Sequence, residues 1–441
     1  MPRADYIFPP GFLWGSATAA HQVEGRNTNN DWYAWEQIPG KIRDGATSER
    51  ASDWWSGRWK EDFDRAAETG QNAHRLSIEW SRIQPAPARW DEDALDRYRQ
   101  IVRGLVQRNL TPMVTLHHFT NPIWLAEMGG WENPQTPEWF AAYTHKVVEA
   151  LKDYVSLWCT INEPNVYVGI SYMDGAWPPG KNDTTAAFTV LANLLRGHAM
   201  AYKIIHEIQK TSRVGAAHHY RPFQPARKTF PPDRWMTNLI NQSFNRAFAD
   251  AITTGKLSFA LKNIRIPEAI KTQDFIGLNY YSYEEVRFVL NSKTTFMKRE
   301  FPKGVEMSGD GMNAFQPDGM FRSLKWARSY GLPILITENG IDDRRDGMRP
   351  RYLVSHLHQV WRGVNFNWQI KGFFHWSLVD NFEWDKGWTT RFGLWGLDVD
   401  TQARIRRRSV DLYERICKEN RISYDLVNEF TPELIPVLFP G

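Results

Sequence analysis

Residues 155–164 read VSLWCTINEP, a short apolar run that ends at Asn162 and Glu163. An apolar run of this length, followed by a long amphipathic stretch, is typical of a buried strand. Residues 333–340, PILITENG, repeat the plan, and here the run ends at Glu338. Each stretch therefore predicts a strand whose carboxyl end carries a glutamate.

Apolar runs of this kind recur along the whole chain, and most are separated by longer amphipathic segments. The predicted strands cover residues 12–18, 73–78, 112–116, 155–161, 214–217, 274–278, 333–337 and 372–376. Predicted helices between them include residues 93–107, 137–151, 186–209, 319–329 and 352–365. This alternation predicts an α/β fold with parallel strands, and eight such units favour a closed (β/α)8 TIM barrel over an open, doubly wound sheet.

The organisation of the chain is simple. No glycine-rich nucleotide-binding signature follows the first predicted strand, which argues against a nucleotide-binding fold. Without an internal repeat, a low-complexity tract or a linker, the sequence predicts a single catalytic domain over residues 1–441. Residues 281–313 are polar and poorly periodic, so they predict a long loop after the sixth strand, on the face where a barrel carries its active site.

The bulk composition argues against several classes of protein. Hydrophobic residues make up 42% and charged residues 24% of the chain, as in soluble globular proteins. A net charge of +4, from 54 basic and 50 acidic side chains, gives no reason to expect nucleic acid as a partner. The arginines between residues 404 and 408 predict a solvated helix face. No apolar stretch approaches the roughly 20 residues that would span a bilayer, so no membrane partner is predicted.

The cysteines and the first residues bear on the compartment. Cys159 lies in an apolar run and is predicted to be buried, whereas Cys417 lies in a charged helical stretch, so no disulfide framework is indicated. Residues 1–20 lack a continuous apolar segment of the kind found in signal peptides. A cytoplasmic location is therefore expected.

Two glutamates stand where a barrel carries its chemistry. The carboxyl ends of all strands face one mouth, so Glu163 and Glu338, after the fourth and seventh predicted strands, should point across it. One such glutamate could merely cap a helix. Two carboxyls are the minimum for glycoside hydrolysis, because one protonates the leaving oxygen while the other stabilises the oxocarbenium-like centre. The 21 tryptophans suit the same chemistry, since sugar rings stack on aromatic faces.

At these two segments the chain resembles the family 1 glycoside hydrolases, and the likeness runs almost end to end. It is carried, in order, by GSATAAHQVEG at 15–25, RLSIEWSR at 75–82, TINEP at 160–164, TENG at 337–340 and WSLVDNFEW at 376–384. The resemblance implies a retaining β-glycosidase, foremost a β-glucosidase. Its expected partners are small β-glycosides or short oligosaccharides, and it implies no cofactor.

The resemblance assigns Glu163 as the general acid/base and Glu338 as the nucleophile that forms a glycosyl-enzyme. While Glu338 is ionised, its charge is expected to raise the pKa of Glu163 and keep that carboxyl protonated. Once the covalent intermediate has removed the charge, Glu163 can act as a base. A bell-shaped pH–rate profile is therefore predicted.

Further positions carry over from the resemblance one by one. The sugar-binding positions are matched by Gln22, His118, Asn162, Tyr281, Trp376, Glu383 and Trp384. Of these, Asn162 is expected to contact the sugar 2-hydroxyl, and Tyr281 also lies beside the nucleophile. The supporting positions are matched by Arg75, which is expected to hold the nucleophile charged and oriented, and more loosely by Asn279 and Phe392, as pocket lining.

The chain departs from the family on the leaving-group side. Asn165 and Asn313 stand where many relatives carry tryptophan, and Phe119 replaces another. The preference for a leaving group is therefore not implied by the resemblance. Other tryptophans either rebuild the aromatic platform or pack beneath loops, and the sequence leaves both open: Trp124, Trp131 and Trp177.

Glu383 bears on the class of sugar. Family members that act on 6-phosphosugars usually lack this glutamate, because a carboxylate there would repel the phosphate dianion. The resemblance therefore implies an unphosphorylated sugar with a terminal β-linkage. Whether glucose, galactose or fucose is preferred stays open, since these sugars differ only in the orientation of single hydroxyls.

The alternatives to a hydrolytic β-glycosidase are a metal site, a transglycosylase and a non-catalytic sugar-binding barrel. The neighbours His117 and His118 lie on opposite faces of a strand and cannot chelate one ion, and the same holds for His218 and His219, so no metal site is predicted. A transglycosylase would share the same intermediate. A non-catalytic sugar-binding barrel is disfavoured because both glutamates are present. A homo-oligomer is expected only by analogy.

Overall fold

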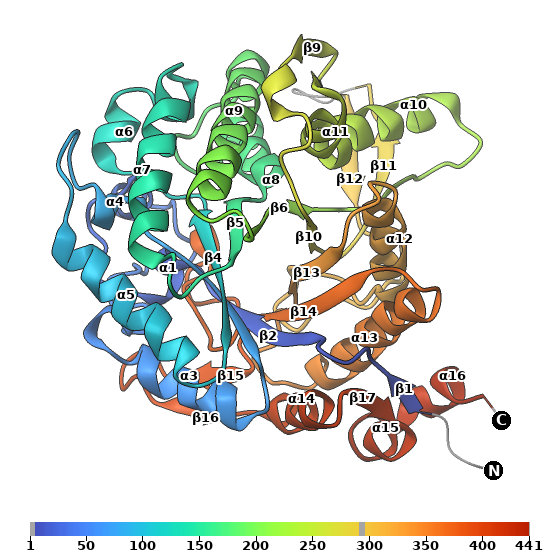
Figure 1. The fold of residues 1–441 in the computed structure, drawn as a ribbon. Coiled ribbons are helices and arrows are strands. Elements are labelled where there is room, and N and C mark those ends of the chain that lie inside the picture. Colours follow the sequence, from blue (N-terminus) through green and yellow to red (C-terminus); the bar gives the residue numbers. More distant parts are fainter. Residues whose placement is uncertain (1–4, 291–295, 441) are drawn as a thin grey trace.

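The structure is a computed structural model that describes residues 5–290 and 296–440. At the centre of this described part, eight parallel strands form a closed barrel (Figure 1). In chain order the strands are β2 (Leu13–Ala17), β3 (Ala73–Ser77), β4 (Thr111–His117), β5 (Leu157–Asn162), β6 (Arg213–His219), β10 (Ile276–Asn279), β13 (Ile334–Asn339) and β14 (Ile370–Trp376). The last strand pairs in parallel with the first, Trp376 opposite Ala17, and this closes the barrel.

The predicted barrel is confirmed, and each predicted strand has a counterpart. All residues of β5 and β13 are buried, because helices cover the outside of the barrel and side chains fill its inside. This burial on both faces explains why the runs are continuously apolar rather than alternating. The strand β6 continues to His219, two residues beyond the predicted end at Ala217, and this places His219 at the barrel mouth.

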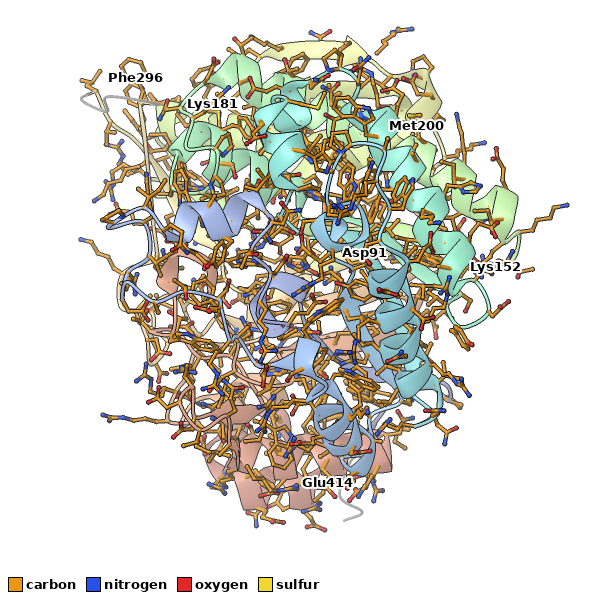
Figure 2. The ribbon with its side chains drawn as sticks, turned by 90° about the vertical axis from the view of Figure 1, so that its left-hand side faces the viewer. Asp91, Lys152, Lys181, Met200, Phe296 and Glu414 are labelled. Carbon is orange, nitrogen blue, oxygen red and sulfur yellow. The ribbon has the colours of Figure 1, made fainter. Side chains whose placement is uncertain are left out.

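Helices form an outer ring in the described part of the chain, one after each barrel strand (Figure 1). They are α3 (Trp59–Glu68), α5 (Glu92–Val106), α7 (Thr136–Leu151), α9 (Thr184–Ile208), α11 (Ala247–Thr254), α12 (Pro317–Arg328), α13 (Arg349–Asn365) and α14 (Arg408–Glu419). Their starts follow local chemistry. At α5 the side chain of Asp91, which is labelled in Figure 2, accepts a hydrogen bond from the Ala94 amide at 2.9 Å and so caps the helix. Leu95, Val102 and Leu105 then face the core.

The arginine run is not the solvated helix face that the sequence predicted. Arg404 begins the short strand β16 (Arg404–Arg406), and its buried side chain pairs with Asp62 at 2.7 Å. Arg407 pairs with Asp380 at 2.8 Å. The prediction failed because it rested on charge alone, and the acidic partners lie far away in the sequence. Arg406, whose side chain is 43% exposed, and Arg408 do face solvent, and of the four arginines Arg408 alone lies in a helix, as the first residue of α14.

The predicted loop at residues 281–313 also contains regular structure. It includes β11 (Glu284–Phe288) and β12 (Met297–Glu300), which pair antiparallel, while β11 pairs in parallel with β7 (Phe223–Pro225). Together with the helix α10 (Pro231–Ile240), this small sheet stands above one side of the barrel (Figure 1). The short strands escaped prediction because their residues are mostly polar and partly exposed.

Two further predictions concern the cysteines and membrane-spanning segments. Cys159 is buried in β5, as predicted, and both Cys159 and Cys417 are free thiols. In the described residues, none of the helices combines the length and the apolar character that crossing a membrane requires.

Candidate active site

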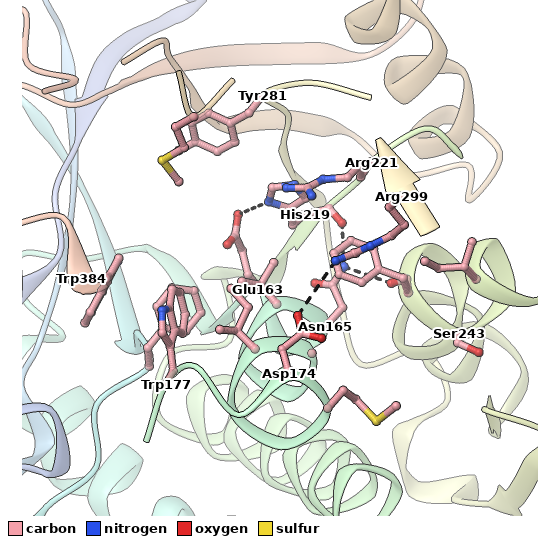
Figure 3. A pocket seen from close by; sticks show the side chains of 18 of the residues that line it. Glu163, Asn165, Asp174, Trp177, His219, Arg221, Ser243, Tyr281, Arg299 and Trp384 are labelled. Atoms are coloured by element: carbon pink, nitrogen blue, oxygen red, sulfur yellow. Dashed lines mark hydrogen bonds and ion pairs between the residues drawn. The ribbon is translucent and has the colours of Figure 1, made fainter. Parts of the chain in front are cut away.

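Glu163 and Glu338 lie at the carboxyl ends of two barrel strands and line the same cavity. Glu163 follows β5 directly, and Glu338 belongs to the last residues of β13. Glu163 is only 5% exposed and Glu338 only 3% exposed. The cavity has a volume of about 490 Å3, which suits a small-molecule ligand. Figure 3 shows Glu163 near the middle of its lining.

Glu338 is held by two hydrogen-bond donors, one at each carboxyl oxygen. Nη1 of Arg75 donates to Oε1 at 2.6 Å, and the hydroxyl of Tyr281 donates to Oε2 at 2.8 Å. Arg75 comes from β3 and is itself 1% exposed. Both contacts favour the charged carboxylate and fix its plane, which is what the sequence expected of these two residues.

Glu163 has a different environment, because both of its side-chain partners contact the same oxygen. Nδ2 of Asn279 donates to Oε1 at 2.8 Å, and Nδ1 of His219 lies 2.9 Å from the same atom. From the sequence, His219 entered only the argument against a metal site. Yet His219 ends β6, so the strand-end criterion that singled out the glutamates applies to it equally. Its contact with Glu163 is the main site feature that the sequence interpretation missed.

A chain of hydrogen bonds joins the two glutamates behind the cavity. Nη2 of Arg75 donates to Oδ1 of Asn162 at 2.7 Å, and Nδ2 of Asn279 reaches the same oxygen at 3.2 Å. Since Arg75 also binds Glu338 and Asn279 also binds Glu163, four barrel strands contribute to one network. This network keeps both carboxyls oriented before any ligand arrives.

The pKa values of the two carboxyls are ordered opposite to the expectation from the sequence. Burial raises the pKa of Glu338 to about 7, against the lowering influence of Arg75. Burial acts in the same direction on Glu163, but His219 and the Asn279 amide outweigh it, and the pKa of Glu163 falls below its ordinary value. The pKa values of the two carboxyls differ because His219 contacts Glu163, and the sequence does not reveal this contact.

A third buried glutamate, Glu383, lies at the end of the cavity that its neighbour Trp384 lines. Nε2 of Gln22 donates to Oε2 of Glu383 at 3.1 Å, and Nδ2 of Asn381 donates to the same oxygen at 3.0 Å. Burial raises the pKa of Glu383 to about 8, with a smaller contribution from the charge of Glu338. The other oxygen of Glu383 is left for a ligand.

Aromatic rings surround this end of the cavity. The imidazole of His118 lies nearly parallel to the ring of Trp376, with centroids 5.8 Å apart, and to that of Trp384 at 6.1 Å. Nε2 of His118 lies 3.1 Å from Nδ2 of Asn162. A flat apolar wall beside several hydrogen-bonding groups is the combination that a sugar ring requires.

The residues selected from the sequence converge on this cavity. Those that line it are His118, Glu163, Tyr281, Glu338, Trp376, Glu383, Trp384 and Phe392. The remaining four bind these lining residues from behind or from the side: Gln22, Arg75, Asn162 and Asn279.

The three positions that depart from the family 1 pattern and the three tryptophans whose role the sequence left open divide into two groups. Phe119, Asn165, Asn313 and Trp177 line the cavity. Trp177 lies close to Trp384, with centroids 5.7 Å apart, so it belongs to the aromatic wall. Two other tryptophans, also buried, pack away from the cavity lining: Trp124 donates to Gln84 O and Trp131 to Asn121 Oδ1.

The histidine pairs point in opposite directions, as strand geometry requires. His117 contacts Asn121 and Trp131, whereas its neighbour His118 lines the cavity. His218 packs against Phe248, whereas His219 contacts Glu163. Within residues 5–290 and 296–440, no three histidine, cysteine, aspartate or glutamate side chains are grouped so that they could hold a metal ion.

A closed (β/α)8 barrel with two buried, differently held glutamates at its mouth defines a class of glycoside-cleaving enzymes. Comparison with known proteins narrows the class. The sequence pattern of glycosyl hydrolase family 1 matches residues 4–422, and the chain belongs to this family of retaining β-glycosidases.

Relatives support the assignment over nearly the whole chain. A 1,4-beta-D-glucan glucohydrolase of Thermotoga neapolitana is 34% identical over 94% of this chain and 99% of its own length. A beta-galactosidase of Pyrococcus woesei is 30% identical over 96% and 99% of the two chains. Among solved structures, a beta-glycosidase from Pyrococcus horikoshii aligns with a TM-score of 0.91 at 36% identity, covering 97% and 98%. The Thermotoga maritima beta-glucosidase in complex with glucoimidazole gives 0.88 at 33%, covering 94% and 99%.

Proposed function

We propose that this enzyme hydrolyses terminal, unphosphorylated β-glucosides and closely related glycosides, with Glu338 as the nucleophile and Glu163 as the general acid/base. The observation that carries the proposal is the different environment of the two carboxyls. Glu338 receives one donor on each oxygen, from Arg75 and Tyr281, as a charged nucleophile needs. Glu163 has both partners on Oε1, which leaves Oε2 for the glycosidic oxygen.

In the first step, a carboxylate oxygen of Glu338 attacks the anomeric carbon while the bond from that carbon to the glycosidic oxygen breaks. The proton on Glu163 passes to the leaving oxygen, which departs as an alcohol. In the second step, Glu163 takes a proton from water as the water attacks the same carbon. The sugar leaves with its original configuration, and Glu338 is free again.

His219 suits both roles of Glu163. With its proton on Nδ1, the imidazole donates to Oε1 of Glu163. Oε1 accepts this bond as the carbonyl oxygen while the proton of the acid is on Oε2, and as a carboxylate oxygen after that proton has been transferred. The contact at 2.9 Å can therefore persist through the cycle without a change of direction.

The far end of the cavity favours a sugar with a free 6-hydroxyl. Glu383 offers an acceptor oxygen there, and Gln22 is oriented by a second bond to the Phe382 carbonyl at 2.9 Å. A phosphate dianion at this depth would lose its hydration beside a carboxyl that offers it no positive charge. The relatives named beta-glucosidase and beta-galactosidase support glucose and galactose as the sugars to test first.

The proposal is tested with the Glu338→Ala variant and a panel of nitrophenyl β- and α-glycosides. The wild type should cleave the β-glucoside, and the variant should be inactive. Azide should restore turnover and yield the α-glycosyl azide, because the small anion enters the space of the missing carboxylate. Cleavage of α-glycosides alone, or a fully active variant, would refute the proposal. Product analysis with added alcohol separates hydrolysis from glycosyl transfer.

A further inference from the structure

The cavity continues beyond Glu163 into a region that the sugar does not need. In Figure 3, Trp384 and Trp177 lie on one side of Glu163, while Asp174, Arg299 and Ser243 lie on the other. We call the second side the apolar arm. It lies between the π-helix η3 (Gly169–Asp174), the helix α10 with the following η4 (Asn241–Arg246), and β12. Its wall is formed mainly by Ile170, Met173, Met236, Ile240, Phe244 and Met297.

Polar groups along this arm are already engaged with the protein. Nδ2 of Asn165 donates to the backbone carbonyls of His219, at 2.7 Å, and Phe244, at 3.0 Å. Oγ of Ser243 accepts from the Ala260 amide at 3.1 Å. Of the described residues that line the arm, three each have one buried atom without a partner: Asn165 (Oδ1), His219 (Nε2) and Arg221 (Nε). The first two lie where the arm begins, beside the catalytic centre.

The charged groups at the rim compensate one another. Arg299 lies 3.9 Å from Asp174 and 3.7 Å from Glu284, and Arg221 pairs with Glu284 at 2.7 Å. Two cations facing two carboxylates give no net charge that would select a charged leaving group. The arm is therefore suited to a neutral molecule.

We propose that the apolar arm binds the leaving group and selects a neutral, apolar alcohol, of the alkyl, terpenyl or aryl class, over a second sugar. This inference rests on the proposed function, which places the leaving group beside Glu163. A pyranose in the arm would bury hydroxyls with few partners, and each unpaired polar group is costly. Alkyl and aryl groups gain from the same wall. The flexible thioethers of Met173, Met236 and Met297 can adapt to different shapes.

The first test uses the wild-type enzyme and three kinds of substrate. β-Glucosyl fluoride has a leaving group too small to enter the arm, so it reports on the catalytic centre alone. Along the series from methyl to octyl β-glucoside, kcat/KM should rise by roughly threefold to fourfold for each methylene that becomes buried. Cellobiose should be slower than octyl glucoside by roughly tenfold or more. A flat alkyl series, or cellobiose as the better substrate, overturns the inference.

The two proposals fail in distinguishable ways. If glucosyl fluoride and all glucosides are inert, the proposed function fails. If glucosyl fluoride is hydrolysed but chain length has no effect, only the apolar arm is refuted. Ile240→Asn and, as a second variant at a half-buried position, Met173→Asn should lower the ratio of octyl to fluoride rates by roughly tenfold. The exposed control Val437→Asn should keep the wild-type ratio; unchanged ratios in both arm variants count against the inference.

Discussion

Nδ1 of His219 lies 2.9 Å from Oε1 of Glu163, and the same imidazole stacks on Tyr281, with ring centroids 5.7 Å apart. The hydroxyl of Tyr281 in turn donates to Glu338. One imidazole thus contacts the proposed acid/base and also supports a residue that holds the proposed nucleophile. It gives the two carboxyls a physical connection on the cavity side, in addition to the amide network behind them.

Replacement of His219 by alanine should move the acid limb of the kcat/KM profile to higher pH. Because the pKa of Glu163 lies below that of Glu338, the form with Glu163 protonated and Glu338 ionised increases with pH up to the pKa of Glu163 and decreases above the pKa of Glu338. The imidazole holds the pKa of Glu163 below its ordinary value, so its removal raises the lower of these two pKa values. Activity on glucosides with poor leaving groups should fall by roughly tenfold or more, because a positioned acid is lost. Glucosides of very acidic phenols, which need little protonation, should be much less affected.

The adjacent residue supplies the control for this prediction. His218 is buried in the same strand but packs against Phe248 and Trp326. His218→Ala should leave the position of the acid limb unchanged. If the His219 variant shows the same loss with every leaving group and no pH shift, the histidine has a purely structural role.

Tyr281→Phe should shift the alkaline limb of the kcat/KM profile upward. The hydroxyl of Tyr281 lowers the pKa of Glu338, which burial already raises to about 7, so its loss raises that pKa further, and this is the higher of the two pKa values that bound the profile. One hydrogen bond to a charged group contributes about 1.5–3 kcal/mol, so kcat/KM should fall by roughly tenfold to a hundredfold. Tyr280→Phe is the matched control, because the Tyr280 hydroxyl donates to Gln316 O instead. An unmoved alkaline limb would contradict the assignment.

Glu383→Gln should abolish most activity on β-glucosides and yet stabilise the fold at alkaline pH. A buried carboxyl whose pKa is raised to about 8 costs stability as the pH rises from its unfolded value near 4.5 through 8. Glutamine removes this cost, and its carbonyl can still accept from Gln22 and Asn381. The gain should be on the order of 2 kcal/mol above pH 8 and vanish near pH 4. Thermal unfolding of both proteins at these two pH values measures it; an equal difference at both would exclude titration of Glu383 as the cause.

Arg404→Met should destabilise the protein by about 3 kcal/mol, because it removes the arginine that binds both oxygens of the buried Asp62 carboxylate and leaves Arg65, at 2.8 Å from Oδ1, as its ion-pair partner. The two side chains are 0% and 1% exposed. The matched control is Arg406→Met, whose side chain pairs with Asp411 at the surface and should contribute less than about 1 kcal/mol. Differential scanning of the two variants should show a clearly lower unfolding temperature only for Arg404→Met. Equal temperatures would refute a structural role for the buried pair.

Much of the fold and part of the site could be predicted from local patterns. The strand β5 is recognisable because both of its faces are buried, so its sequence is a continuous apolar run. Glu163 and Glu338 could be selected because the ends of parallel barrel strands meet at one mouth. The small sheet of β11 and β12 could not be predicted, since its strands owe their pairing to β7 and not to an apolar pattern of their own.

Several predictions from the sequence remain to be examined by experiment. The division of the chain into a single catalytic domain, the cytoplasmic location and the homo-oligomer depend on properties of the whole protein in solution. The preferred sugar also stays open, since glucose and galactose differ by one hydroxyl orientation that the same polar residues can accommodate.

The amino-acid sequence by itself determined the barrel and the two glutamates at its mouth, because both follow from periodicity and from residues within a few positions of each strand end. Only the tertiary structure decided that His219 contacts Glu163, that Arg404 is buried against Asp62, and that η3 and α10 together form the apolar arm. The physical reason is distance along the chain: Glu163 and His219 are 56 residues apart, and Asp62 and Arg404 are 342 apart. Such contacts, and the pKa values that depend on them, exist only once the closed barrel brings the strand ends and loops together.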